Sequence, residues 1–272
     1  MLQRIITGAI LLTALVAVLA LGGWVFSVVA MIAICIALRE EYQALSTAGH
    51  RPVQWPVWAG LVVCVPLVLL HSSRVIVPLL MFQCLLILIC VVFRENPSLE
   101  DALMSIMPLA FILLPGMCIV SLAQLQPRAL QLTLLCLVFV VSVLGDTVAY
   151  FVGSRVGGPK LCPQVSPKKT ISGAIGGLMG SVLGALIVGA IAGMCAPDSR
   201  ELLPGVLSYL ILGLVGGVAG QMGDLFCSMV KRHCGVKDFS SIFPGHGGML
   251  DRLDSILFTA VVVFCYQLFF IV

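Results

Sequence analysis

Residues 203–232 read LPGVLSYLILGLVGGVAGQMGDLFCSMVKR, and residues 233–250 continue as HCGVKDFSSIFPGHGGML. The first stretch is apolar for most of its length and becomes charged only near its end, whereas the second is polar and rich in glycine. A helix of about 30 residues is longer than the hydrocarbon core of a bilayer is thick. We therefore expect a membrane helix whose last turns, from Gln221 to Arg232, project into or beyond the interface.

The rest of the chain is equally apolar. Of its 272 residues, 60% are hydrophobic and 10% are charged, whereas soluble domains have about 25% charged residues. This composition leaves no room for a large soluble domain and predicts an all-α polytopic membrane protein. About nine stretches are long enough to span a bilayer, and they cover residues 5–22, 24–39, 56–71, 75–93, 104–123, 129–153, 171–195, 203–232 and 251–271.

The distribution of Lys and Arg predicts the topology of these nine helices. With a cytoplasmic N-terminus and an outside C-terminus, 12 of the 15 basic residues fall on the inner side. The outer side then carries only Arg74, Arg128 and Arg200. Cytoplasmic loops of membrane proteins show such an excess of positive charge. The polar loops 154–170 and 233–250 are therefore expected to face the cytoplasm.

Glycine and cysteine are both interpreted as packing residues. Small residues at three- and four-residue spacing let membrane helices approach closely, and two stretches show this spacing: Gly173, Gly176, Gly177, Gly180 and Gly184, then Gly213, Gly216, Gly217 and Gly220. The 11 cysteines lie mostly in apolar stretches and form no C-x-x-C pair. We interpret them as small core residues rather than as metal or redox sites.

Asp224 lies near the inner end of the predicted span 203–232. A carboxylate is costly in hydrocarbon and commonly marks a functional site. On a helix, Asp224, Ser228 and Lys231 share one face, because they are spaced i, i+4 and i+7. The alternative is an internal salt bridge from Asp224 to a lysine or arginine.

A second acidic group, Asp251 and Asp254 with Ser255, opens the last predicted span. The spacing i, i+3 places both carboxylates on one helical face. Mg²⁺ is usually held by one or two carboxylates together with phosphate oxygens and water. The alternative is that these residues cap the helix and stabilise its dipole.

The turn from Pro244 to Gly248 precedes that helix. Successive N–H groups in such a glycine-rich turn form anion-binding nests in other proteins. Gly247 and Gly248 are therefore predicted to contact a phosphate, and His246 either donates a hydrogen bond to it or is simply a turn residue.

The other polar loop ends in Ser166-Pro-Lys-Lys-Thr170. Pro167 favours a turn, and Thr170 or Ser172 is suited to cap the helix that follows. Lys168 and Lys169 at a helix N-terminus oppose the helix dipole, which indicates an anionic partner. The alternative is attraction to anionic lipid.

These motifs together resemble those of the phosphatidate cytidylyltransferases, the CDP-diacylglycerol synthases. The pattern S-x-x-K-R-x4-K-D-x5-P-G-H-G-G-x2-D-R-x-D-S over residues 228–255 is similar to their signature. Further similarity lies in 145–153, 166–170, 173–177 and 221–225, with a weaker echo in Glu40-Glu-Tyr42. The chain departs from many of these enzymes at Ser172, where they have glutamate.

The resemblance implies a nucleotidyltransferase of phospholipid biosynthesis in a bacterial-type inner membrane. Such an enzyme transfers CMP from CTP to phosphatidic acid and releases pyrophosphate. It implies Mg²⁺ held by Asp224 and Asp251, allows a second cation such as K⁺, and implies a homodimer with no nucleic-acid partner. Residues 129–272 then form the catalytic region and residues 1–128 an N-terminal transmembrane region.

The resemblance also implies roles for individual residues. Asp224, Asp251, Lys169 and Lys231 are the predicted catalytic residues. Substrate binding is assigned to Lys168, Thr170, Ser228, Arg232, Lys237, Asp238, His246, Gly247, Gly248, Arg252, Asp254 and Ser255. Which cation contacts which phosphate stays open.

The competing hypothesis from another class is a membrane transporter of a phosphorylated solute. Transporters of that kind show repeat symmetry and helices broken at the bilayer midplane. The polar groups of this chain gather instead at one side of the predicted membrane, which favours an interfacial enzyme.

Overall fold

The computed structural model describes residues 2–69 and 76–271. The predicted span ends at 71 and 75, and Arg74, lie outside the described residues. The chain folds into two compact units. The N-terminal unit comprises residues 1–124 and 233–252, and the C-terminal unit comprises residues 125–232 and 253–272.

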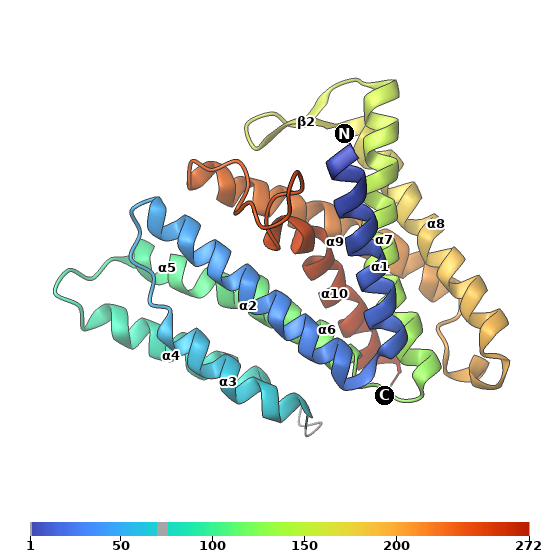
Figure 1. Cartoon of the computed structure of the whole chain (residues 1–272), viewed down its shortest axis with the longest axis horizontal. Coiled ribbons are helices and arrows are strands. Elements are labelled where there is room, and N and C mark those ends of the chain that lie inside the picture. The colour runs from blue at the N-terminus through green and yellow to red at the C-terminus, as the bar shows by residue number, and fades with distance from the viewer. Residues whose placement is uncertain (1, 70–75, 272) are drawn as a thin grey trace. The chain divides into compact units, whose positions relative to one another are not determined.

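The N-terminal unit is built from helices (Figure 1). In chain order they are α1 (Leu2–Leu21), α2 (Gly23–Thr47), α3 (Trp55–Leu69), α4 (Ile76–Val92), α5 (Leu99–Pro108), the π-helix η2 (Leu109–Leu113) and α6 (Leu114–Leu122). The π-helix lies between Pro108 and Pro115. Proline removes a backbone donor, and neighbouring turns rearrange to satisfy the freed carbonyls.

The C-terminal unit begins with α7 (Arg128–Val156), and α7 and α8 lie side by side (Figure 1). The remaining elements are the strands β1 (Lys160–Cys162) and β2 (Ser166–Thr170), α8 (Ile171–Cys195), the 3₁₀-helix η3 (Pro197–Leu202), α9 (Val206–His233) and α10 (Leu250–Phe270). Helix α9 is 28 residues long, as the sequence predicts, and starts after Pro204 and Gly205.

The fold is mostly helical, and six helices of the described part are long and apolar enough to cross a membrane. They are Gly23–Thr47, Leu99–Leu122, Arg128–Val156, Ile171–Cys195, Val206–His233 and Leu250–Phe270. Three other predicted spans correspond to apolar helices that are shorter over their described residues, Ile6–Leu21, Trp55–Cys64 and Val77–Val92. The count of nine spans and the orientation of the termini stay predictions.

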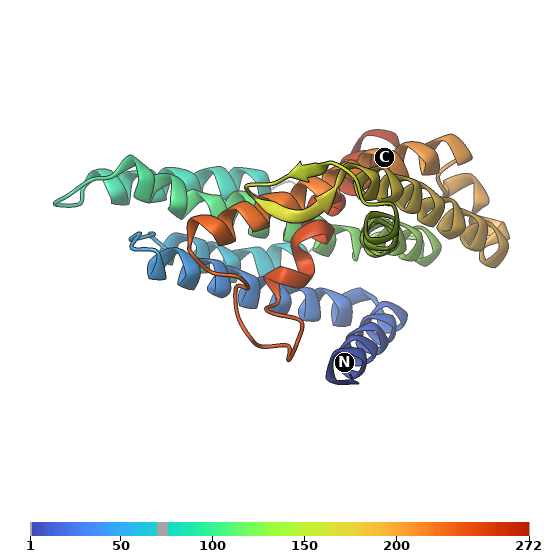
Figure 2. The ribbon, with the colours of Figure 1, turned by 90° about the horizontal axis from the view of Figure 1, so that it is seen from above.

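The expectation of an all-α protein is wrong in one place. Strands β1 and β2 pair antiparallel between α7 and α8, with Lys160 opposite Thr170 (Figure 2). The segment 166–170 was predicted to be a turn. Pro167 disfavours a helical conformation at Ser166, and pairing two short strands satisfies backbone groups that no helix would satisfy.

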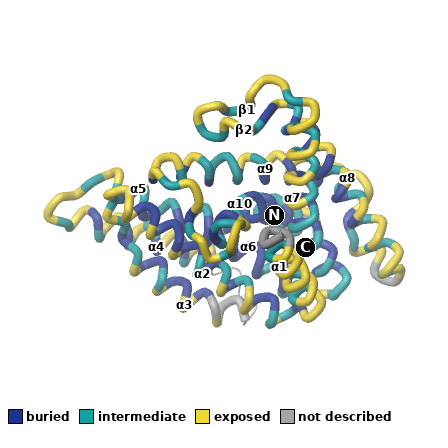
Figure 3. Tube along the Cα trace, turned by 45° about the horizontal axis from the view of Figure 1, so that its top comes forward, coloured by how far each residue is buried: buried dark blue, intermediate teal, exposed yellow. Residues whose placement is uncertain are grey.

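The hairpin is less buried than helix α2. Figure 3 shows the hairpin largely exposed or intermediate, whereas α2 carries several buried residues. The glycines of α8 and α9 lie at close helix contacts. A Cβ atom at Gly213 would lie 2.6 Å from Cα of Val182, and one at Gly180 would lie 2.7 Å from Cβ of Val148. The predicted packing role of these glycines is therefore confirmed.

Candidate active site

The C-terminal unit brings three predicted site residues into direct contact. The Lys169 ammonium lies 2.5 Å from Oδ2 of Asp224, and each side chain is about one quarter exposed. The Ser228 hydroxyl donates a weak hydrogen bond of 3.4 Å to Oδ1 of the same carboxylate. Lys169 comes from strand β2, whereas Asp224 and Ser228 lie one turn apart on α9. The salt bridge considered as an alternative for Asp224 is therefore present.

Two more carboxylates and a second ammonium belong to the same group of charges. Asp254 in the first turns of α10 interacts electrostatically with Asp224, Asp146 and Lys231. We refer to Asp146, Asp224 and Asp254 with Lys169 and Lys231 as the carboxylate cluster. Three carboxyl groups and two ammonium groups therefore lie together in this cluster.

Hydrogen bonds hold the α10 side of this cluster in place. The Ser255 hydroxyl donates to Oδ2 of Asp146 at 2.9 Å, and the Ser255 N–H donates to Oδ1 of Asp254 at 2.8 Å. A small cavity beside them is lined by polar and small residues, among them Ser142, Asp146, Ser181, Gln221 and Ser255. Asp146 thus has the Ser255 hydroxyl as a partner.

The hairpin separates the two lysines that the sequence had grouped. Successive side chains of a strand point to opposite faces, and Lys169 faces Asp224 while Lys168 is exposed. Thr170 caps α8, because its hydroxyl accepts a hydrogen bond of 3.1 Å from the Gly173 N–H. This confirms the predicted cap. Lys168 and Lys169 therefore start from opposite faces of the hairpin.

In the N-terminal unit, Asp251 holds the glycine-rich turn. It is buried, and its Oδ2 accepts hydrogen bonds of 2.9 Å from the backbone N–H groups of Phe239 and Gly248. Gly247 has a φ of 79°, and a Cβ atom there would lie 2.8 Å from that same Oδ2. The turn and the carboxylate therefore fit together only if residue 247 is glycine.

Glu40 is a second anchor of this turn, and the sequence showed it only as a weak similarity. Its carboxylate is buried, and it accepts hydrogen bonds from the Ser240 hydroxyl at 2.5 Å, from Met249 N–H at 2.9 Å and from Leu250 N–H at 2.8 Å. The two N–H groups belong to the start of α10, so Glu40 caps that helix from α2. The sequence signal for Glu40 was an acidic side chain near the end of an apolar stretch.

The turn thus binds anions, but those anions are carboxylates of the protein itself. N–H groups of Gly248, Met249 and Leu250 are all used by Asp251 or Glu40. His246 is part of the turn, since its N–H donates to Phe243 O at 2.8 Å. Its Nδ1 is buried and has no hydrogen-bond partner among the described residues. Phosphate binding by Gly247, Gly248 and His246 stays a prediction.

The remaining predicted residues are exposed. Lys237, Asp238, Arg232 and Arg252 reach the surface, and Arg232 Nε makes a long contact of 3.5 Å with Val165 O. Such side chains are available to a ligand.

Cys234 at the start of the same loop is buried, and burial, with a further contribution from the Glu41 carboxylate, raises the pKa of its thiol.

Residues 2–270 match the Cytidylyltransferase family. The chain belongs to this family. The resemblance stated for the motifs between residues 145 and 255 is thereby confirmed and extends over nearly the whole chain.

Individual relatives agree with this assignment. The chain is 32% identical over 272 residues to the phosphatidate cytidylyltransferase of Brucella abortus biovar 1 (strain 9-941), covering 98% of this chain and 93% of the relative. It is 30% identical over 305 residues to the phosphatidate cytidylyltransferase of Synechocystis sp. (strain ATCC 27184 / PCC 6803 / Kazusa), covering 97% and 95%. A 60-residue segment is 50% identical to the uncharacterized protein YnbB of Escherichia coli (strain K12), covering 22% and 20%.

Proposed function

We propose that this protein is a phosphatidate cytidylyltransferase, which transfers CMP from CTP to phosphatidic acid and yields CDP-diacylglycerol and pyrophosphate. The observation that carries the proposal is the similarity to enzymes of that name over nearly the whole chain. The carboxylate cluster supplies chemistry that suits it, because ammonium and carboxylate groups gather at one end of α9.

The chemical problem of this reaction is charge rather than basicity. The phosphate of phosphatidic acid is an anion at neutral pH, so its attack on the α-phosphorus of CTP needs no strong general base. Two polyanions must instead be brought together in line, which calls for positioning and for compensating charge. Lys169 and Lys231 are the residues we propose to supply that charge. An ammonium group has three donors, so Lys169 is able to keep Asp224 and donate to a phosphate oxygen.

Mg²⁺ is the cofactor we propose, held by Asp224 and Asp251, and K⁺ is a candidate for a second cation. Asp224 and Asp251 each offer a carboxylate, and Mg²⁺ usually binds through one or two carboxylates plus phosphate oxygens and water. Bound Mg²⁺ would screen the triphosphate and stabilise the departing pyrophosphate. Ser228 and Lys169 orient the Asp224 carboxylate, and the two N–H donors orient that of Asp251.

The surrounding arrangement belongs to the same proposal. Nine spans with a cytoplasmic N-terminus would place the hairpin and the 233–249 loop on the cytoplasmic side of an inner membrane, where CTP is available. Phosphatidic acid would keep its acyl chains in the bilayer and offer its phosphate at the interface. We further propose a homodimer, which light scattering of the detergent-solubilised protein would test.

Turnover by the purified protein tests the function. Mixed micelles containing phosphatidic acid receive labelled CTP with Mg²⁺ or with EDTA, and CDP-diacylglycerol and pyrophosphate are measured. We expect equal amounts of the two products with Mg²⁺ and none with EDTA. No product from folded protein, with or without added K⁺, would refute the proposal and favour transport of a phosphorylated solute, which flux assays in liposomes would detect.

A further inference from the structure

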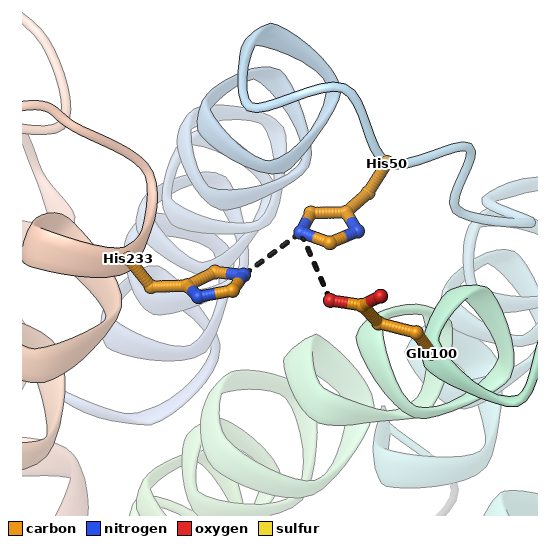
Figure 4. Close-up of side chains that lie close together, drawn as sticks. All are labelled: His50, Glu100 and His233. Atoms are coloured by element: carbon orange, nitrogen blue, oxygen red, sulfur yellow. Dashed lines mark hydrogen bonds and ion pairs between the residues drawn. The ribbon is translucent and has the colours of Figure 1, made fainter.

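Two histidines and a glutamate converge in the N-terminal unit, outside the residues discussed so far. His50 Nε2 lies 2.8 Å from His233 Nε2 and 3.9 Å from Glu100 Oε1. One potential ligand atom from each of the three residues lies within 4.8 Å of the others. Figure 4 shows the three side chains reaching toward one another from separate segments. We refer to them as the His–Glu group.

The backbone at His50 is fixed independently of this contact. Helix α2 ends in a turn in which Gly49 has a φ of 95° and the His50 N–H donates to Leu45 O at 3.2 Å. The next residue, Arg51, donates its N–H to Oδ1 of Asp101 at 2.9 Å. The imidazole therefore projects from a rigid helix terminus.

The other two members also lie at helix termini. Glu100 is in the first turn of α5, where the Ser98 hydroxyl accepts from the Asp101 N–H at 3.3 Å. His233 is the last residue of α9 and is followed by Gly235 with a φ of 68°. Ligands whose backbones are already fixed lose less conformational freedom on binding an ion than ligands on mobile loops would, which favours affinity.

The arginine near Glu100 pairs with a different carboxylate, so the Glu100 carboxylate can contact the histidines. Asp101, its neighbour, pairs with Arg94 at 3.6 Å. Among the described residues, the ion pair that Glu100 makes is with His50. The His50 side chain is 12% exposed and that of Glu100 is 60% exposed, so the group is held by protein on one side and open to water on the other.

The chemistry of this donor set is that of a transition-metal site. Neutral imidazole binds Zn²⁺ and related ions, and a carboxylate completes a common three-residue set with a fourth position for water. At metal–ligand distances of about 2.0–2.2 Å, ligand atoms of a tetrahedral site are about 3.3–3.6 Å apart. The observed separations bracket that range, so small side-chain rotations would complete the site.

We propose that His50, Glu100 and His233 form a binding site for a divalent transition-metal ion of the Zn²⁺ type. The site joins the end of α2, the start of α5 and the end of α9. His233 opens the loop that carries Lys237, so a bound ion would fix the beginning of that loop. The site shares no residue with the proposed Mg²⁺ ligands, and its existence does not depend on the proposed activity.

Metal titration of the full-length protein tests this proposal. Purified protein is stripped with a chelator, returned to chelator-free detergent buffer and titrated with Zn²⁺ alone, and the bound metal is counted by mass spectrometry. His50→Gln, Glu100→Gln and His233→Gln each remove one ligand, and His246→Gln is the matched control for loss of a histidine elsewhere in the unit. Unfolding temperatures without metal show that every variant is folded.

The proposal predicts that wild type and His246→Gln bind one more equivalent of Zn²⁺ than each ligand variant, or bind it at least about 100-fold more tightly. Co²⁺ in the same site is expected to give the visible bands of nitrogen and oxygen ligation. Equal Zn²⁺ binding by wild type and the three ligand variants would overturn the proposal. A Co²⁺ spectrum dominated by sulfur charge transfer and unchanged in the variants would overturn it as well. His50 and His233 would then be a hydrogen-bonded pair that binds no metal.

Discussion

Replacing Glu40 by alanine should loosen the start of α10 and the loop before it. The Glu40 carboxylate accepts hydrogen bonds from Met249 N–H and Leu250 N–H, at 2.9 and 2.8 Å, and from the Ser240 hydroxyl. Leaving a buried N–H group without an acceptor costs about 1–3 kcal/mol. The two backbone groups together therefore lose about 2–6 kcal/mol, which corresponds to about 30-fold to 10⁴-fold in the equilibrium for local opening.

Hydrogen–deuterium exchange in detergent micelles measures this opening. In Glu40→Ala, peptides covering residues 239–252 should exchange faster by about that factor, while peptides of α7 and α8 should be unchanged. Glu40→Gln keeps one oxygen and turns an N–H₂ group toward one of the donors, so its effect should be about half in free energy. Turnover should fall in the same order, because Asp251 depends on the same turn.

Glu41 provides the matched control, since it is the next residue and is also buried. Its Oε2 has no hydrogen-bond partner in the described part of the chain. Glu41→Gln replaces a buried carboxyl group without removing a helix cap, so it should leave exchange in 239–252 as in wild type. Wild-type exchange in Glu40→Ala, or equal acceleration in both variants, would refute the reasoning.

Three other predictions concern packing, catalysis and topology. Gly213→Ala should destabilise the protein by about 1–3 kcal/mol in detergent unfolding, because the new Cβ would lie 2.6 Å from a backbone atom. Gly193→Ala is the control, since a Cβ there meets open space and should leave stability unchanged. Equal unfolding temperatures of the two variants would contradict this prediction. Lys169→Gln should lower turnover by about 10²–10³-fold. It should lower the free energy of unfolding by less than about 1 kcal/mol, since the ion pair is partly exposed. Unchanged turnover would exclude a catalytic role for Lys169. Among single-cysteine variants, Cys162 should react with an impermeant maleimide only in inverted vesicles and Cys195 only in right-side-out ones, and the reverse would overturn the topology.

The helices were predictable because hydrocarbon imposes a simple rule on the chain. A segment that cannot bond to water must form its own backbone hydrogen bonds, so apolar length alone predicted residues 171–195 correctly. The glycine spacing of α8 and α9 likewise indicated close packing, since few functions other than packing need it. The hairpin was not predicted because its ten or so residues show no alternation of apolar and polar side chains. Two short strands pair because of the contacts between them, which a local sequence pattern does not reveal.

The site was predictable in its residue types but not in its contacts. The spacing of Asp224 and Ser228 on one helical turn is local and was confirmed. The pairing of Lys169 with Asp224 joins a strand to a distant helix, and helix spacing alone indicated only that Asp224 could pair with some lysine or arginine. The Glu40 contacts span up to 210 residues of chain, and the His–Glu group joins His50 to His233 over 183 residues, distances that local sequence patterns do not predict.

The most direct measurement compares Asp224→Asn with wild type under single-turnover conditions. Both proteins are mixed with labelled CTP and excess phosphatidic acid, and CDP-diacylglycerol and pyrophosphate are counted together at a series of Mg²⁺ concentrations. The account predicts that wild type forms the two products in equal amounts and that Asp224→Asn, although folded, is slower by orders of magnitude and needs more Mg²⁺. Wild-type rates and the same Mg²⁺ dependence in Asp224→Asn would contradict it.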